Sequence, residues 1–154
     1  MDSRELTFRL AGPADAEAVR QLVREAYAKW VAVIGREPRP MLADYARAVV
    51  EHQVEMAFEG ERFVGLIETE IREDHFWIEN VAVRPGAQGK GLGRMLLALA
   101  EDKARAAGRR EMRLLTNALM DVNIALYQRV GYAVTRNEPF MGGVAVHMSK
   151  RLAD

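Results

Sequence analysis

The chain has 154 residues, in which 22 Lys and Arg balance 22 Asp and Glu, so its length predicts one domain and its charge indicates neither a nucleic-acid nor a membrane partner. The absence of cysteine excludes a disulfide scaffold, cysteine metal ligands and a thiol nucleophile. The first ten residues lack a signal-peptide pattern, and no apolar run approaches the about 20 residues that span a bilayer, so we expect a single cytoplasmic domain over residues 1–154.

The first third of the chain predicts one strand and two helices. Residues 6–10 alternate like a short strand. Pro13, Ala14 and Asp15 are typical of a helix start, and the apolar spacing that follows predicts a helix as far as about Trp30. After a Pro-rich loop over residues 35–40, the pattern predicts a second helix from Met41 to about residue 52.

The middle of the chain predicts an antiparallel meander. Apolar residues alternate with other residues over 54–58, and Gly60 follows as a turn residue. Residues 63–71 and 76–83 are two further strands by the same reasoning.

The last third mixes helices and strands. Leu92, Met95, Leu96, Leu99 and Lys103 fall on one face of a predicted helix, which Gly108 would end. A strand over 112–116, a helix over 122–130 and a closing hairpin of 132–136 with 144–152 follow. A strand, helix and strand in succession imply a parallel crossover. The predicted class is α/β, with a mixed, mostly antiparallel central sheet, helices on both faces and one parallel crossover.

Four glycines crowd the junction between a strand and the next helix, at positions 86, 89, 91 and 93. Glycines at a helix N-terminus let consecutive amides converge on an anion, where the helix dipole also favours negative charge. A tight turn without a ligand is the alternative, and Gly93 alone could serve close helix packing. Gln88, Lys90 and Arg94 among the glycines favour phosphate binding.

The loop matches neither of two common phosphate-binding patterns. A P-loop requires glycine where Arg84 stands and Ser or Thr where Gly91 stands. The dinucleotide fingerprint requires a third glycine where Arg94 stands. Residues 88–93, QGKGLG, fit Q-x-x-G-x-G instead, and here the chain resembles the GNAT superfamily of acyl-CoA-dependent N-acetyltransferases.

Two further segments carry the resemblance. Residues 79–83, ENVAV, look like the family's central strand, and residues 123–132, NIALYQRVGY, look like its late helix. The resemblance implies that two strands splay apart and hold acetyl-CoA between them. The residues it assigns to the cofactor are Val81, Ala82, Val83, Gln88, Gly89, Lys90, Gly91, Leu92, Gly93, Arg94, Asn117, Asn123 and Tyr127.

Glu79 and Asn80 are polar residues in an otherwise apolar strand. A buried carboxylate is costly unless it is paired or functional. An acceptor ammonium with a pKa near about 10.4 must lose a proton before it attacks, and Glu79 could take that proton directly or through a water. A solvated glutamate or a salt bridge to an arginine are the alternatives.

The resemblance also assigns roles on the late helix and in the central strand. Tyr127 would protonate the departing thiolate, and Asn123, four residues earlier, would contact the pantetheine arm. Their alternative roles are a packing tyrosine and a helix cap. Asn117 is a weaker candidate for a contact with cofactor or acceptor. The amide of Val81 would polarise the thioester carbonyl.

The acceptor wall is predicted from element order in the family. Its candidates are Tyr27, Trp30, Arg36, Met41 and Tyr45, of which Arg36 would suit a carboxylate. Core packing is the alternative for each aromatic residue and for Met41. His75 is expected in a turn, and His52 and His147 show no metal-ligand spacing, so no metal is expected.

The expected function is transfer of an acetyl group from acetyl-CoA to a primary amine, by direct attack in a ternary complex. A non-catalytic acyl-CoA-binding sensor is the alternative. A nucleotide-binding oxidoreductase fails on the missing glycine. The acceptor, a small molecule or a peptide amine, stays open because fold does not identify it, as does a homodimer, which is a habit of the family.

Overall fold

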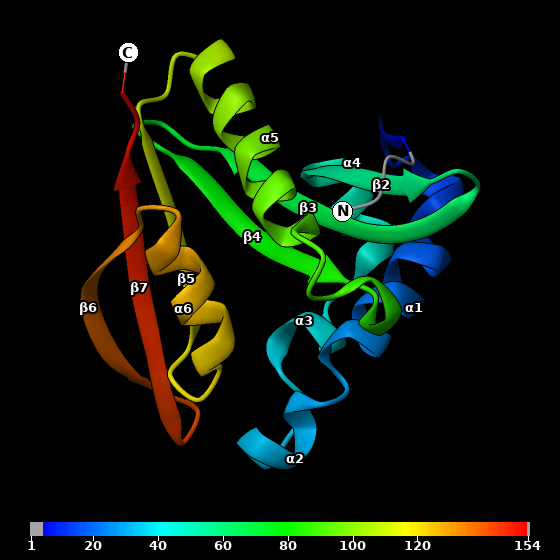
Figure 1. The fold of residues 1–154 in the computed structure, drawn as a ribbon. Coiled ribbons are helices and arrows are strands. Elements are labelled where there is room, and N and C mark those ends of the chain that lie inside the picture. Colours follow the sequence, from blue (N-terminus) through cyan, green and yellow to red (C-terminus); the bar gives the residue numbers. More distant parts are fainter. Residues whose placement is uncertain (1–4, 154) are drawn as a thin grey trace.

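The computed structural model describes residues 5–153, and its seven strands form one sheet in the order β1-β2-β3-β4-β5-β7-β6 (Figure 1). All neighbouring strands are antiparallel except β4 and β5, which are parallel. The strands are β1 (Leu6–Leu10), β2 (Gln53–Glu59), β3 (Arg62–Ile71), β4 (Phe76–Val83), β5 (Glu111–Asn117), β6 (Ala133–Phe140) and β7 (Gly143–Arg151).

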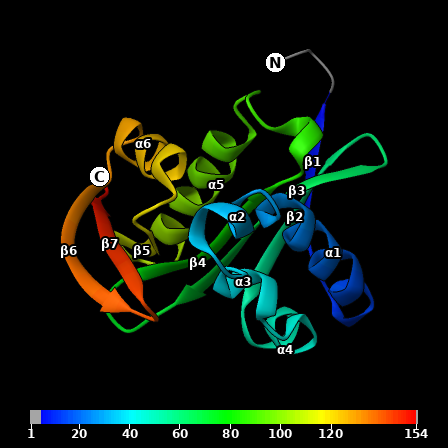
Figure 2. The same cartoon turned by 90° about the horizontal axis from the view of Figure 1, so that it is seen from below.

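Helices cover both faces of this sheet (Figure 2). One face carries α1 (Ala16–Tyr27), α2 (Trp30–Ile34), α3 (Arg39–Leu42) and α4 (Tyr45–Glu51). The other carries α5 (Leu92–Ala106) and α6 (Asp121–Arg129), and α5 is the crossover between the parallel strands β4 and β5. The predicted fold class is confirmed. Among residues 5–153, no helix is long and apolar enough to cross a membrane.

Helix α5 is held to the sheet by a stripe of apolar residues. Leu96 and Leu97 are almost fully buried, and Ala100 and Ala104 continue the stripe with no exposed surface. Full burial of a leucine contributes roughly 1.5–3 kcal/mol. Met95, which the sequence placed on the buried face, is 39% exposed. Gly108 follows the helix with φ +75°, as its predicted role as the stop requires.

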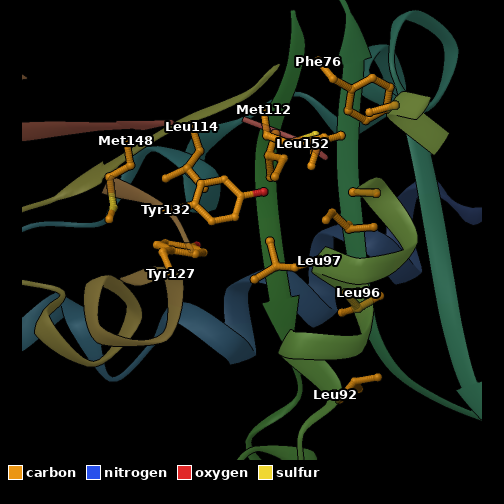
Figure 3. Packing of buried hydrophobic residues seen from close by; sticks show 14 of the residues in the cluster. Phe76, Leu92, Leu96, Leu97, Met112, Leu114, Tyr127, Tyr132, Met148 and Leu152 are labelled. Atoms are coloured by element: carbon orange, nitrogen blue, oxygen red, sulfur yellow. The ribbon is translucent and has the colours of Figure 1, made fainter. Parts of the chain in front are cut away.

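The sheet separates two hydrophobic clusters. The cluster beside α5 and α6 contains Tyr127 and Tyr132, whose ring centroids are 6.1 Å apart (Figure 3). The cluster beside α1 and α4 contains Tyr27, Trp30 and Tyr45. Large side chains therefore hold both helical layers against the sheet that carries the candidate site.

The predicted N-terminal helices are wrong in their boundaries. The first helix is interrupted after Tyr27, and α2 continues it to Ile34. The second is split because Asp44 is extended and its side chain accepts a hydrogen bond from the amide of Arg47, which caps α4. The last two residues of the predicted loop over 35–40 belong to α3 in the structure.

The closing hairpin is longer than predicted. Strand β6 continues past Arg136 to Phe140, through Pro139. Because β6 lies at the edge of the sheet, a proline without an N–H group is tolerated there.

Candidate active site

A β-bulge at Glu79 changes which face of the sheet the residues of β4 occupy. Thr69 pairs with Ile78 and Glu68 with Asn80, so one residue of β4 has no opposite partner. Before the bulge, Ile78 packs beside α5, and after it, Val81 does. Asn80 therefore faces α1 and α4.

Beyond the bulge, β4 and β5 separate. Their parallel pairing covers only Phe76 to Ile78 against Met112 to Leu114. The amide of Arg84 bonds the carbonyl of Val64 in β3. Because alternate residues of an antiparallel strand bond a given neighbour, Val81 and Val83 direct their backbone groups to the other side, into the gap. The splayed strands that the family resemblance implies are thus present.

The glycine segment enters α5 at the mouth of this gap. Gly89 and Gly91 have φ of +80° and +83°, and a Cβ on either would meet nothing within 4 Å. The first amides of α5 have no acceptor within the helix. Open space in front of a helix N-terminus therefore fits a phosphate or pyrophosphate group.

Other residues of the segment have different surroundings. A Cβ on Gly93 would come within 3.2 Å of Leu126, so this glycine allows α5 and α6 to pack closely. The Gln88 side chain donates to the carbonyl of Val83 (2.9 Å) and accepts from Lys29 (2.7 Å), which joins the loop to both β4 and the start of α2. Lys90 is exposed.

Two cavities meet at the gap. The larger, of about 580 Å³, lies between the N-terminal helices and strands β4, β5 and β7. The smaller, of about 330 Å³, lies along the glycine segment, and its lining includes Ala82, Val83, Gln88, Gly89, Gly91, Leu92, Gly93 and Arg94. Both are lined by Tyr27, Val81, Asn123 and Tyr127. A donor in one cavity and an acceptor in the other would meet at these four residues.

Tyr127 is buried at this junction. Burial raises the pKa of its phenol to about 12, so the hydroxyl keeps its proton at neutral pH. Asn123, one turn earlier, donates to the sulfur of Met120 at 3.7 Å. Asn117 lines the larger cavity and accepts a hydrogen bond from the amide of Leu119.

Glu79 lines the larger cavity, and its carboxylate accepts a hydrogen bond from the indole of Trp77 at 3.3 Å. Within residues 5–153, Glu79 makes no ion pair with Lys, Arg or His within 4.0 Å. The carboxylate therefore faces the cavity without a fixed cationic partner.

The wall opposite Glu79 is tied to β4 by a buried hydrogen-bond network. The Tyr27 hydroxyl lies 2.7 Å from Asn80 Oδ1, and Asn80 Nδ2 donates to the Tyr45 hydroxyl at 3.2 Å. Tyr45 donates to the carbonyl of Pro40 at 2.6 Å. Burial raises the pKa of both phenols, which stay neutral. Asn80 thus joins α1, α3 and α4 to the bulge.

The other residues predicted for the acceptor wall are separated by the fold. Arg36 lines the larger cavity. Trp30 lines the smaller one instead, beside the glycine segment. Met41 is 6% exposed and packs in the cluster beside α1.

Sequence reasoning missed a buried acidic group in the larger cavity. The side chain of Glu68 is 5% exposed, and His52 Nδ1 donates to it at 2.6 Å. Burial raises the pKa of Glu68, the negative charges of Glu79 and Glu70 add to this, and the hydrogen bond from His52 offsets only part. Burial lowers the pKa of His52, but the carboxylates outweigh it and the net pKa is raised.

This acidic group is not arranged as a metal site. Among the residues that the structure describes, no three His, Cys, Asp or Glu side chains are grouped to hold a metal ion. His75 lies in the turn between β3 and β4, as expected, with Asp74 as its partner.

Comparisons with known proteins agree with this geometry. The IAA acetyltransferase of Azospirillum brasilense is 41% identical over 56 residues, 36% of this chain and 37% of that protein. The L-amino acid N-acyltransferase MnaT of Escherichia coli (strain K12) is 38% identical over 63 residues, 41% of this chain and 37% of that protein. The matches therefore span little more than a third of the length of these two relatives.

The fold has a solved counterpart over nearly all of its length. The structure of the PaiA N-acetyltransferase from Thermoplasma acidophilum, in complex with coenzyme A, superposes with a TM-score of 0.82 at 22% identity. The match covers 96% of this chain and 99% of that one. The acetyltransferase (GNAT) family model matches residues 16–132, most of the chain. The family predicted from the glycine segment is thereby confirmed, and the chain belongs to the acetyltransferase (GNAT) family.

Proposed function

We propose that the protein transfers an acetyl group from acetyl-CoA to a primary amine, by direct attack while both substrates are bound. The observation that carries the proposal is the meeting of two cavities at Val81 and Tyr127. One cavity runs along an anion-binding helix start and the other contains a carboxylate without a cationic partner. A donor with phosphates and an acceptor with an ammonium group suit these two surroundings.

The cofactor site would use backbone groups more than side chains. The amides of Gly89 to Arg94 would hold the pyrophosphate, and the backbone of Val81 and Val83 would pair with the amides of the pantetheine arm as an added strand would. When bound, acetyl-CoA supplies the thioester carbonyl that the amine attacks and the thiol that leaves. Asn117 and Asn123 would contact the same arm, and Lys90 would act only through its charge.

Three residues would act on the reacting atoms. Glu79 would take the proton of the acceptor ammonium. The amide of Val81 would stabilise negative charge as it develops on the carbonyl oxygen. Tyr127 would donate a hydrogen bond to the departing sulfur. Because the pKa of the phenol is about 12 against about 8.5 for a thiol, this hydrogen bond would stabilise the thiolate while the proton stays mainly on the phenol oxygen.

The acceptor cavity combines carboxylates with Arg36 and the network of Tyr27 and Tyr45. This combination supports an acceptor with an amine and a second polar group. The name of the E. coli relative refers to L-amino acids, so amino acids open the acceptor panel, followed by polyamines and peptides with free N-termini. Met41 would support this wall from behind, whereas Trp30, which lines the smaller cavity, would lie beside the cofactor. We also propose a cytoplasmic location and, as a habit of the family, a homodimer.

The test is an acceptor screen at saturating acetyl-CoA, with amine-dependent thiol release as the readout and a calorimetric isotherm for coenzyme A beside it. Release with at least one amine supports the enzyme. Cofactor binding without release from any amine would favour the alternative, a sensor that binds acyl-CoA without chemistry.

A further inference from the structure

The pair of His52 and Glu68 has no role in the function proposed above, although it lies in the same cavity as Glu79. Strand β3 supplies Glu68, directly opposite Asn80 and next to the bulge. His52 follows the last residue of α4. A carboxylate with 5% exposure is costly to bury. An ion pair that only fastened α4 to β3 would not need to line the acceptor cavity.

We propose, on the basis of that function, that His52 and Glu68 form a proton relay, which takes the acceptor's proton from Glu79 and releases it to solvent. An N–H bond of the acceptor ammonium breaks, and its electron pair stays on the nitrogen for the attack. The proton moves to the carboxylate of Glu79 and then to the imidazole of His52. Glu79 is a carboxylate again, and the imidazolium loses the proton to water.

The shared cavity supplies the inner end of this relay, because Glu79, Glu68 and His52 all line it. The Glu68 side chain is buried, whereas 21% of the His52 side chain is exposed, so the pair leads from the cavity to the surface. Because His52 Nδ1 donates to Glu68, the carboxylate stabilises the imidazolium when it forms. This orientation of an imidazole by a carboxylate is the arrangement that makes histidine a base in other enzymes.

Charged groups around His52 raise its pKa above the ordinary value for histidine, although burial alone would lower it. On β3, Glu70 lies 3.6 Å from Nε2, in addition to Glu68. On β4, Glu79 raises the pKa of both members of the pair. Arg72 bonds Glu70 at 2.8 Å and stacks on Trp77, which partly neutralises this cluster.

Other residues on α4 and on the elements packed against it are paired or apolar. On α4 itself, Glu51 forms an ion pair with Arg47 on the outer surface. From β2 and α1, Val54 and Val19 pack in the cluster that contains α4. The Glu68, Glu70 and Glu79 carboxylates therefore dominate the field at the imidazole.

The chain offers a matched control for this pair. His147 and Glu138 form a second histidine–glutamate pair, 2.5 Å apart, on β7 and β6. Its histidine is 19% exposed, close to the 21% of His52. Neither residue of this second pair lines either cavity. Substitutions at His52 and His147 thus remove histidines of similar exposure, one inside and one outside the larger cavity, although Glu138 is 38% exposed and Glu68 only 5%.

The first experiment compares kcat/KM against pH for wild type, His52→Gln and His147→Gln with the best amine of the screen. We expect a wild-type acid limb at the pKa of His52, measured by NMR titration in a chain with three histidines. His52→Gln should lower kcat/KM about 10-fold or more at neutral pH, with the loss shrinking as free amine accumulates. His147→Gln should match wild type.

A second experiment separates chemistry from structure. Added imidazole should restore activity to His52→Ala and leave His147→Ala unchanged. Glu68→Gln should move the acid limb to lower pH, because the carboxylate raises the pKa of His52. If Glu68→Gln does not fold, the relay is tested by the variants of His52, whose side chain is more exposed than that of Glu68.

Results that contradict the relay can be distinguished from results that contradict the proposed function. A wild-type pH profile in His52→Gln, or a uniform loss across pH that imidazole does not rescue, would overturn the relay and leave a structural pair. Wild type that binds coenzyme A but acetylates no amine would overturn the proposed function first, and the relay with it.

Discussion

Glu79 occupies the position where the hydrogen-bonding pattern of β4 is interrupted. The extra residue of a bulge re-aims its side chain, and here the carboxylate faces the larger cavity beside Trp77. In a regular strand, the alternation of side chains alone would determine which face of the sheet this side chain occupies. The bulge is therefore the local cause of a cavity carboxylate in an otherwise apolar strand.

Replacing Glu79 with Gln removes the base but keeps the size of the side chain. Turnover should fall most near neutral pH, by about 10²–10⁴-fold, and recover in part as pH rises and more amine is unprotonated. A pH–rate profile with the screened acceptor measures this. Glu111→Gln, a strand carboxylate outside both cavities, is the control. A profile that matches wild type would assign Glu79 to structure.

Tyr127→Phe tests whether the phenol acts on the departing sulfur. The ring, and with it the packing against Tyr132, is kept. We expect nearly unchanged acetyl-CoA affinity and a kcat lower by on the order of 10²-fold, because water replaces the phenol only in part. The deficit should shrink with an acyl donor whose thiol has a lower pKa.

Tyr132→Phe is the matched control for this substitution. The Tyr132 hydroxyl is buried and has no hydrogen-bond partner among the described residues, so its removal should cost neither stability nor rate. An equal rate loss of Tyr127→Phe across donors, or a large rise in its cofactor Kd, would make Tyr127 a positioning residue.

At the scale of elements, the sequence predicted those features that depend on local pattern. The glycine segment, the helix α5 and the position of Tyr127 on α6 follow from residue type and period. The buried stripe of α5 differs from the predicted face, because it includes Leu97, Ala100 and Ala104 in place of Met95, Leu99 and Lys103. The Asp44 cap that divides α3 from α4 was also visible as an N-cap residue before a helical pattern, and was missed. The bulge was not visible, because the polar residues Glu79 and Asn80 do not by themselves show that the strand pairing shifts there.

Gly91→Glu tests the anion-binding element. A side chain would obstruct the amides at the start of α5, and its carboxylate would repel the pyrophosphate. Calorimetry should detect no coenzyme A binding to a protein that is still folded. The left-handed backbone at this position adds a strain of about 1–2 kcal/mol.

Gly108→Glu controls for that strain. Gly108 has φ +75° against +83° for Gly91, and a Cβ on either meets nothing within 4 Å. Gly108 lies beyond the opposite end of the same helix, so its substitution should lower stability by a similar amount and leave cofactor affinity unchanged. Normal affinity in Gly91→Glu would remove the phosphate-binding role.

At the scale of the whole molecule, the site depends on contacts that no local pattern contains. Glu68 belongs to a Glu-Thr-Glu stretch that is typical of a half-exposed strand, and His52 shows no informative spacing. They meet only because β3 and the end of α4 lie side by side in the fold. The same holds for Tyr27 and Tyr45, which Asn80 joins from different helices.

The joined cavities predict the kinetic mechanism. Val81, Tyr127, Tyr27 and Asn123 line both cavities, so donor and acceptor can be bound at once and react without a carrier. The chain has no cysteine to hold an acetyl group between two half-reactions. Initial rates over a matrix of acetyl-CoA and amine concentrations should therefore give intersecting double-reciprocal lines. Mass spectrometry after incubation with acetyl-CoA alone should find unmodified protein. Parallel lines together with a stable acetylated chain would replace direct transfer by a covalent route.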